Sequence, residues 1–165
     1  MGPDSASSRA DDSSETGRAS ADQAVPAAHA VPPEVYQDAQ AILDSALRGD
    51  RDGVVGRFEA ALNRGGLRSA YDVACCLAAT MVGDNHPGGF AALDFPDIEK
   101  ARYDARWVAR FVSAYANADA STGQALFGAA MADGWLAECL TTLAGSTVAT
   151  LRRRSQGLGD AAYGS

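Results

Sequence analysis

Three cysteines and one histidine are the residues best suited to chemistry in the part of the chain that is expected to fold. Cys75 and Cys76 are adjacent, Cys139 is far away in the sequence, and His86 stands in a stretch rich in glycine and proline. A thiolate–imidazole pair needs a cysteine held beside the histidine, but all three cysteines lie in apolar stretches, where cysteine usually packs as a small core residue. An odd number with two neighbours is also a poor disulfide framework. We therefore expect reduced, buried thiols in a cytoplasmic protein.

Other catalytic and cofactor-binding patterns are missing from the sequence. It contains no G-x-S-x-G elbow, no H-E-x-x-H, no paired C-x-x-C and no EF-hand loop. Asp84 and His86 with Asp94 or Asp97 could form only a weak metal site, and four such residues in one loop are usually solvated. The sequence therefore indicates no catalytic residue, no cofactor and no metal, and it favours a non-enzymatic protein.

An arginine stripe is the main candidate for a binding surface. Arg102, Arg106 and Arg110 recur at four-residue steps, so a helix places them on one face, with Tyr103 and Trp107 one residue further round. The chain has 14 basic and 21 acidic residues, for a net charge of -7, so this positive stripe contrasts with the rest of the protein. Arginine beside aromatic residues is typical of protein interfaces. The structural alternative is that the arginines form ion pairs with carboxylates of the same chain.

A second candidate is the irregular segment between Gly83 and Pro96. It contains His86, Phe90 and Phe95, and it is the longest irregular stretch inside the expected fold. Long structured loops are often functional. The alternative, which we favour, is a tether whose aromatic residues pack over the seam between the segments that it joins.

The composition divides the chain into a central domain and two tails. Residues 1–31 are rich in Ser, Ala and Asp and show no helical or strand periodicity, so they predict a disordered acidic tail without a secretory signal. Residues 155–165 are rich in glycine and predict a flexible end. Between them, residues 32–154 predict one domain. The apolar runs are too short for a membrane span, so we expect no membrane contact.

The central domain reads as all-α. No proline lies in the interior of a segment with helical periodicity, since Pro33 stands at the first position of one, and no segment alternates like a strand. The expected helices span residues 33–48, 50–65, 69–83, 97–115, 121–134 and 135–153.

An internal repeat relates the second half of this domain to the first. The main matched pairs, which align without a gap, are Asp50 with Asp119, Phe58 with Phe127, Ala61 with Ala130 and Gly65 with Gly134. Each pair has a physical role as helix cap, core anchor, close helix contact or C-terminal glycine. The repeat predicts a six-helix domain made of two copies of a three-helix unit, at about 33–83 and 97–153, joined by residues 84–96. A short solenoid and a pseudo-symmetric bundle are both compatible with it.

These features favour a cytoplasmic interaction or regulatory protein that binds a protein partner, or a second copy of itself, through a helix face. One alternative is a transcriptional regulator, because Ala61, Gly65 and Tyr71 have the spacing of a helix-turn-helix motif. However, the helix after the turn lacks a basic face and the acidic chain would be repelled by phosphate, which argues against nucleic acid. The other alternative is a small-ligand-binding or biosynthetic accessory protein with a pocket at the seam of the repeat.

Removing residues 1–31 should leave the melting temperature unchanged, because their composition cannot support packing against the domain. Thermal unfolding of the full chain and of the shortened chain checks this. A loss of several degrees would show that the segment docks on the domain and that the boundary at residue 32 is wrong.

Overall fold

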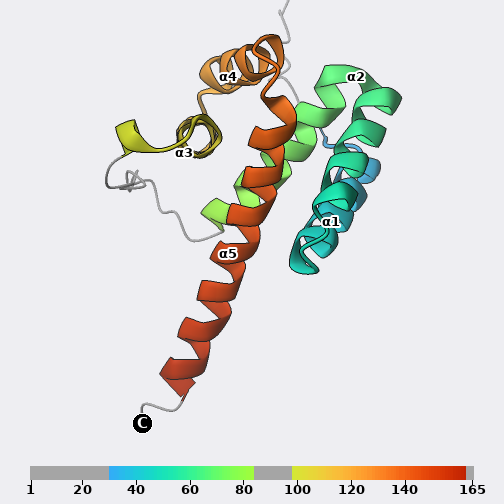
Figure 1. Ribbon diagram of the computed structural model, residues 1–165. Helices are drawn as coiled ribbons and strands as arrows, with labels where there is room; N and C mark the ends of the chain where they lie inside the picture. The colour runs from blue at the N-terminus through green and yellow to red at the C-terminus, as the bar shows by residue number, and fades with distance from the viewer. Residues whose placement is uncertain (1–29, 84–97, 163–165) are drawn as a thin grey trace, which may run out of the picture. The chain divides into compact units, whose positions relative to one another are not determined.

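Helices are the only regular elements among residues 30–83 and 98–162, the part of the chain that the computed structural model describes (Figure 1). In order they are α1 (Pro33–Leu47), α2 (Arg51–Val82), the 3-10 turn η1 (Ile98–Lys100), α3 (Tyr103–Ala116), α4 (Ala120–Ala132) and α5 (Leu136–Ala162). The chain divides into the units Met1–Ala30 and Val31–Ser165, and the description below concerns the second. The predicted all-α class is confirmed. Residues 1–29 of the predicted N-terminal tail and the predicted loop 84–96 lie outside the described residues. Val31, which the sequence assigns to the tail, is half-buried and packs against the core.

The starts of several helices follow from single residues. Proline occupies the first position of α1, where its fixed φ suits a helix and its missing N–H costs nothing. The carboxylate of Asp50 accepts a hydrogen bond of 2.9 Å from the Gly53 N–H, and that of Asp119 accepts one of 3.0 Å from the Thr122 N–H. Both aspartates therefore cap their helices as the sequence predicts.

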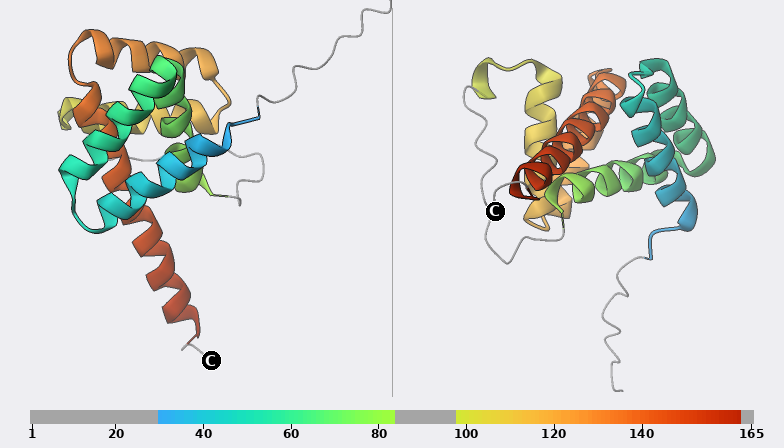
Figure 2. Two further views of the ribbon diagram at one scale, coloured as in Figure 1. Left: turned by 90° about the vertical axis from the view of Figure 1, so that its right-hand side faces the viewer. Right: turned by 90° about the horizontal axis from the view of Figure 1, so that it is seen from below.

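A sharp bend divides α2 into two parts. Gly66 has φ 65° and ψ -165°, a conformation outside the helical region, and the helix continues on both sides of it. The two helices predicted at 50–65 and 69–83 are thus one bent element, with the break at the predicted glycine pair. Because the bend changes the direction of the chain, the second part of α2 turns away from α1 and runs toward α5 (Figure 2).

The first half of α5 is the other central element. It contacts α1 and α2 on one side and α3 and α4 on the other (Figure 1). The side chains that are fully buried between these helices are mostly aliphatic or aromatic: Phe111, Ile42, Leu77, Leu143, Val54, Val73, Val112, Thr147 and Cys139. Such interdigitated apolar packing is the main source of the fold's stability.

Two predicted helix boundaries are wrong. The helix expected from residue 97 begins at Tyr103 instead, after the short turn η1, and no side chain caps it. The helix expected to end at residue 153 continues to Ala162. Glycine lowers helix propensity by about 1 kcal/mol per residue but does not break a helix as proline does. The glycines after residue 155 therefore do not end α5.

The repeated segments agree at their anchors and differ at their turns. Phe58 and Phe127 are buried to 5% and 3% exposure, and Ala61 and Ala130 are fully buried. At the turns, however, the chain bends within α2 at Gly66, whereas α4 and α5 are separate helices with a positive φ at Gly134. The repeat aligns Gly65 with Gly134, so the bend at Gly66 falls one residue later than the repeat predicts.

Replacing Gly66 with alanine should destabilise the protein by about 1–3 kcal/mol, because its backbone conformation is one that essentially only glycine adopts. Space is not the reason, since an added Cβ there meets no atom within 4 Å. Gly56 is a matched control: it lies inside α2 with equal space around it. Gly56→Ala should stabilise the protein by about 0.5–1 kcal/mol. Urea unfolding of both variants checks this, and equal effects would contradict the role given to the bend.

Candidate functional site

The three arginines of the predicted stripe have different surroundings. Arg102 precedes α3, and its side chain is 81% exposed with Nε 3.5 Å from Oδ1 of Asp104. Arg106 is half-buried and Arg110 is exposed. Among the residues that the structure describes, no carboxylate forms an ion pair with Arg106 or Arg110, so the ion-pairing alternative holds only for Arg102.

Trp107 is a core residue, which corrects its predicted place beside the arginines on the surface. It is only 3% exposed, and its indole stacks on Phe111 with 4.7 Å between ring centres. The indole N–H donates a hydrogen bond of 2.9 Å to the Leu126 carbonyl of α4. The reason is the phase of α3: residues 107, 108, 111 and 112 form its inner face, so the helix turns the tryptophan toward α4.

A small hollow nevertheless brings four of the five predicted residues together. Tyr103, Arg106, Trp107 and Arg110 line it with Leu126 of α4, and its volume is about 140 Å³. The Tyr103 hydroxyl donates to Oδ2 of Asp133 at 3.1 Å. Partial burial and this hydrogen bond raise the pKa of the Tyr103 phenol, which stays protonated at neutral pH. The hollow therefore has an aromatic and aliphatic wall and two guanidinium groups at its edge.

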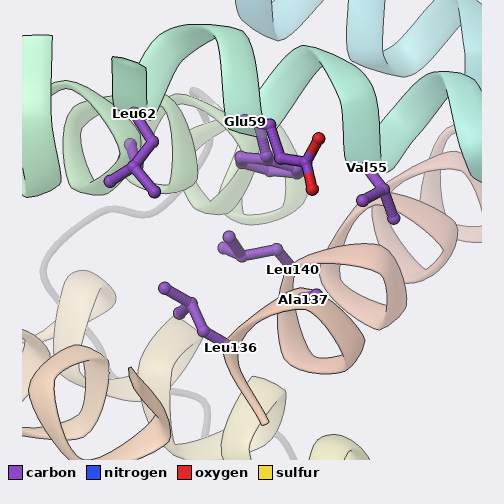
Figure 3. A pocket seen from close by; sticks show the side chains of 8 residues that line it. Val55, Glu59, Leu62, Leu136, Ala137 and Leu140 are labelled. Carbon is purple, nitrogen blue, oxygen red and sulfur yellow. The ribbon is translucent and has the colours of Figure 1, made fainter. Parts of the chain in front are cut away.

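An apolar groove lies between the first part of α2 and the start of α5. Its lining is Val55, Phe58, Glu59, Leu62, Ala70, Leu136, Ala137 and Leu140, and its volume is about 200 Å³. Figure 3 shows the leucines of the two helices pointing toward one another across it. Leu62 is 37% exposed, although its side chain is large and apolar. None of these residues is predicted as a site residue from the sequence, although the small-ligand alternative expects a pocket at the seam of the repeat.

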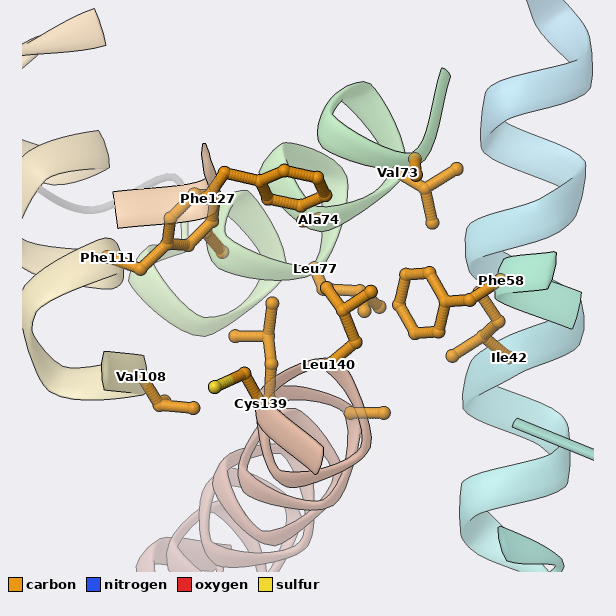
Figure 4. Close-up of a cluster of buried hydrophobic side chains, with 14 of the residues drawn as sticks. Ile42, Phe58, Val73, Ala74, Leu77, Val108, Phe111, Phe127, Cys139 and Leu140 are labelled. Atoms are coloured by element: carbon orange, nitrogen blue, oxygen red, sulfur yellow. The ribbon is translucent and has the colours of Figure 1, made fainter. Parts of the chain in front are cut away.

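The cysteines have the surroundings of core residues. Cys139 is fully buried, and its side chain lies near Val108 (Figure 4). Cys75 and Cys76 are half-buried and line a wide, open depression with Tyr36 and Tyr115. Burial raises the pKa of Cys75 to about 11 and that of Cys139 to about 12, so these thiols are uncharged at neutral pH. An uncharged thiol is a poor nucleophile.

Other chemistry has no support in the described part of the chain. No group of three or more His, Cys, Asp or Glu side chains there could hold a metal ion. The loop candidates His86, Phe90 and Phe95 lie outside the described residues. No helix within residues 30–83 and 98–162 combines the length and the apolar character needed to cross a membrane.

The comparisons with known proteins do not extend this description. No family model, no curated protein and no solved structure matches the chain. The site must therefore be judged by its own geometry and charge.

Cys75 should react about a hundredfold more slowly with iodoacetamide at pH 8 in the folded protein than in the denatured one. A pKa near 11 leaves far less thiolate than the ordinary value near 8.5. Pulsed alkylation followed by mass spectrometry measures the rate for each cysteine. Equal rates in the two states would show that burial does not raise the pKa of Cys75, and a faster rate in the folded protein would show an activated thiol.

Proposed function

We propose that this protein is a non-enzymatic interaction module that binds an acidic segment of a protein partner through the face of α3. The observation that supports it is the hollow lined by Tyr103, Arg106, Trp107 and Arg110, at whose edge two arginines have no ion-pair partner among the described residues. An arginine fork binds carboxylates in a bidentate manner. Tyrosine and arginine are also the side chains that most often dominate interface energies.

The hollow suits a carboxylate side chain better than a free small molecule. Its volume of about 140 Å³ is below the roughly 300 Å³ at which ordinary ligand pockets begin. Trp107 has a positioning role in this proposal, because its buried indole holds α4 against α3 and fixes the hollow's wall. The partner would contact the aromatic edge of Tyr103 and the guanidinium groups of the half-buried Arg106 and the exposed Arg110.

A DNA-binding regulator is supported less well. The second part of α2, which would follow the turn of a helix-turn-helix, contains one arginine, Arg68, and its Nε lies 3.4 Å from Asp72. Residues 136–148 of α5, the equivalent segment of the second copy, contain no basic residue. Phosphate contacts need lysine or arginine, so neither helix offers a face for the DNA backbone.

A small-ligand protein is the second alternative. The depression lined by Tyr36, Tyr115, Cys75 and Cys76 has a volume of about 790 Å³, which is within the size range of ligand pockets. It is open rather than enclosed, so a small molecule would remain largely solvated there. A thermal shift with metabolites from cell extract would favour this alternative.

We also infer that the domain contains two copies of a three-helix unit. The equal capping by Asp50 and Asp119 and the burial of Phe58 and Phe127 support it. A crystal structure that placed the two phenylalanines on different faces of their helices would contradict it.

The double variant Arg106→Glu, Arg110→Glu should no longer bind the partner. The measurement is a pull-down, in which tagged protein is expressed in the source organism and the proteins that co-purify with it are identified. The double variant should keep its helicity, because neither arginine is buried or forms an ion pair with another described residue, and surface substitutions usually alter stability by only about 0.5 kcal/mol. The matched control is Arg51→Glu with Arg57→Glu, which makes the same change in net charge at exposed positions of α2.

Three results would contradict the proposal. Loss of the partner in the control as well would indicate a general charge effect. Retention of the partner by the double variant would exclude the α3 face. Salt-dependent binding of the wild-type protein to DNA, measured by fluorescence anisotropy, would instead support a regulator.

A further inference from the structure

The groove between α2 and α5 carries an inference that is independent of the α3 face. We propose that it is a docking site for a basic amphipathic helix of a partner protein. The helix would insert a large apolar side chain between Leu62 and Leu136 and place a lysine or arginine beside Glu59.

The shape and lining of the groove favour an inserted side chain. Seven of the eight residues that line it are apolar, and together they enclose about 200 Å³. Leu62 and Leu136 both keep exposed surface there although each could bury it against a partner (Figure 3). Burying a leucine-sized apolar side chain is favourable, so an apolar anchor in this groove would contribute to binding.

The spacing of the lining residues favours a helix as the occupant. Val55, Phe58, Glu59 and Leu62 are at positions i, i+3, i+4 and i+7 of α2, which form one stripe along the helix. This stripe is about two turns long, or about 10 Å, and the start of α5 forms the opposite wall. A groove with a helix on each side accepts the apolar face of a third helix through residues three and four apart.

The charges at the groove favour a basic partner. Glu59 is exposed and is the one charged residue in the lining, so no cation of the lining neutralises it. A lysine or arginine one turn from the apolar anchor would meet the Glu59 carboxylate, and the protein's net charge of -7 would speed the encounter.

The test uses the full chain and a synthetic helix as the probe. The probe is a fluorescein-labelled peptide of about 18 residues, with leucine on one face and lysine on the other, long enough to form a helix on binding. Fluorescence anisotropy at physiological salt measures its affinity for the wild-type protein and the variants. A second peptide, in which glutamate replaces every lysine, tests the sign of the charge.

We expect Leu62→Asp and Glu59→Lys each to weaken binding by about tenfold or more. Two control variants make the same changes away from the groove: Leu47→Asp, at a leucine that is 46% exposed on α1, and Glu34→Lys in the first turn of α1. Both controls should bind the probe within about twofold of the wild-type protein. Circular dichroism checks that every variant is folded. If Leu62→Asp does not fold, Glu59→Lys still tests the proposal.

Several results would overturn the proposal. Equal weakening by Glu59→Lys and Glu34→Lys would show that the peptide senses net charge only. Equal binding of the glutamate peptide would exclude a basic partner. Sedimentation in which the wild-type protein is a dimer and Leu62→Asp a monomer would show that a second copy of the chain fills the groove. Because neither groove variant changes α3, loss of probe binding here and loss of the α3 partner can be told apart.

Discussion

The packing of Tyr71 against two phenylalanines joins the halves of this domain. Its ring lies edge-on to Phe111 of α3, with 6.0 Å between ring centres, and edge-on to Phe127 of α4 at 5.6 Å. Gly123 of α4 makes this contact possible, since a Cβ there would lie 2.9 Å from the tyrosine hydroxyl. Burial raises the pKa of Tyr71 to about 12, so the phenol stays uncharged among these rings. The second part of α2 is thereby held against α3 and α4.

This aromatic cluster also determines what the surface of α3 can offer. Trp107 stacks on Phe111 and donates its indole N–H to the Leu126 carbonyl, which holds α4 alongside α3. Since the inner face of α3 is thus fixed, Arg106 and Arg110 are left at its edge. The binding face that we propose therefore depends on a core contact, because the packing of Trp107 on Phe111 and Leu126 positions its two arginines.

The arginines near the end of α5 stabilise other helices. Arg154 donates hydrogen bonds to the carbonyls of Thr80 and Val82 in the last turn of α2, at 2.8 and 3.3 Å. Arg152 donates one of 3.2 Å to the Leu47 carbonyl at the end of α1. Helix C-terminal carbonyls lack intrahelical donors and carry partial negative charge, so both contacts are favourable. They attach α5 to the C-terminal ends of α1 and α2. The groove, in contrast, lies at the first residues of α5.

The sequence by itself determined the helical class, the capping aspartates, the buried phenylalanine anchors and the place of the break in α2. These depend on local signals, such as apolar periodicity, side-chain caps and paired glycines, which act within one helix. Only the tertiary structure decided that Trp107 is buried, that Arg152 and Arg154 cap other helices, and that a groove opens beside Leu62. Each of these depends on which helix lies opposite, and helical phase alone cannot say whether an apolar face meets a neighbour fully or leaves a gap.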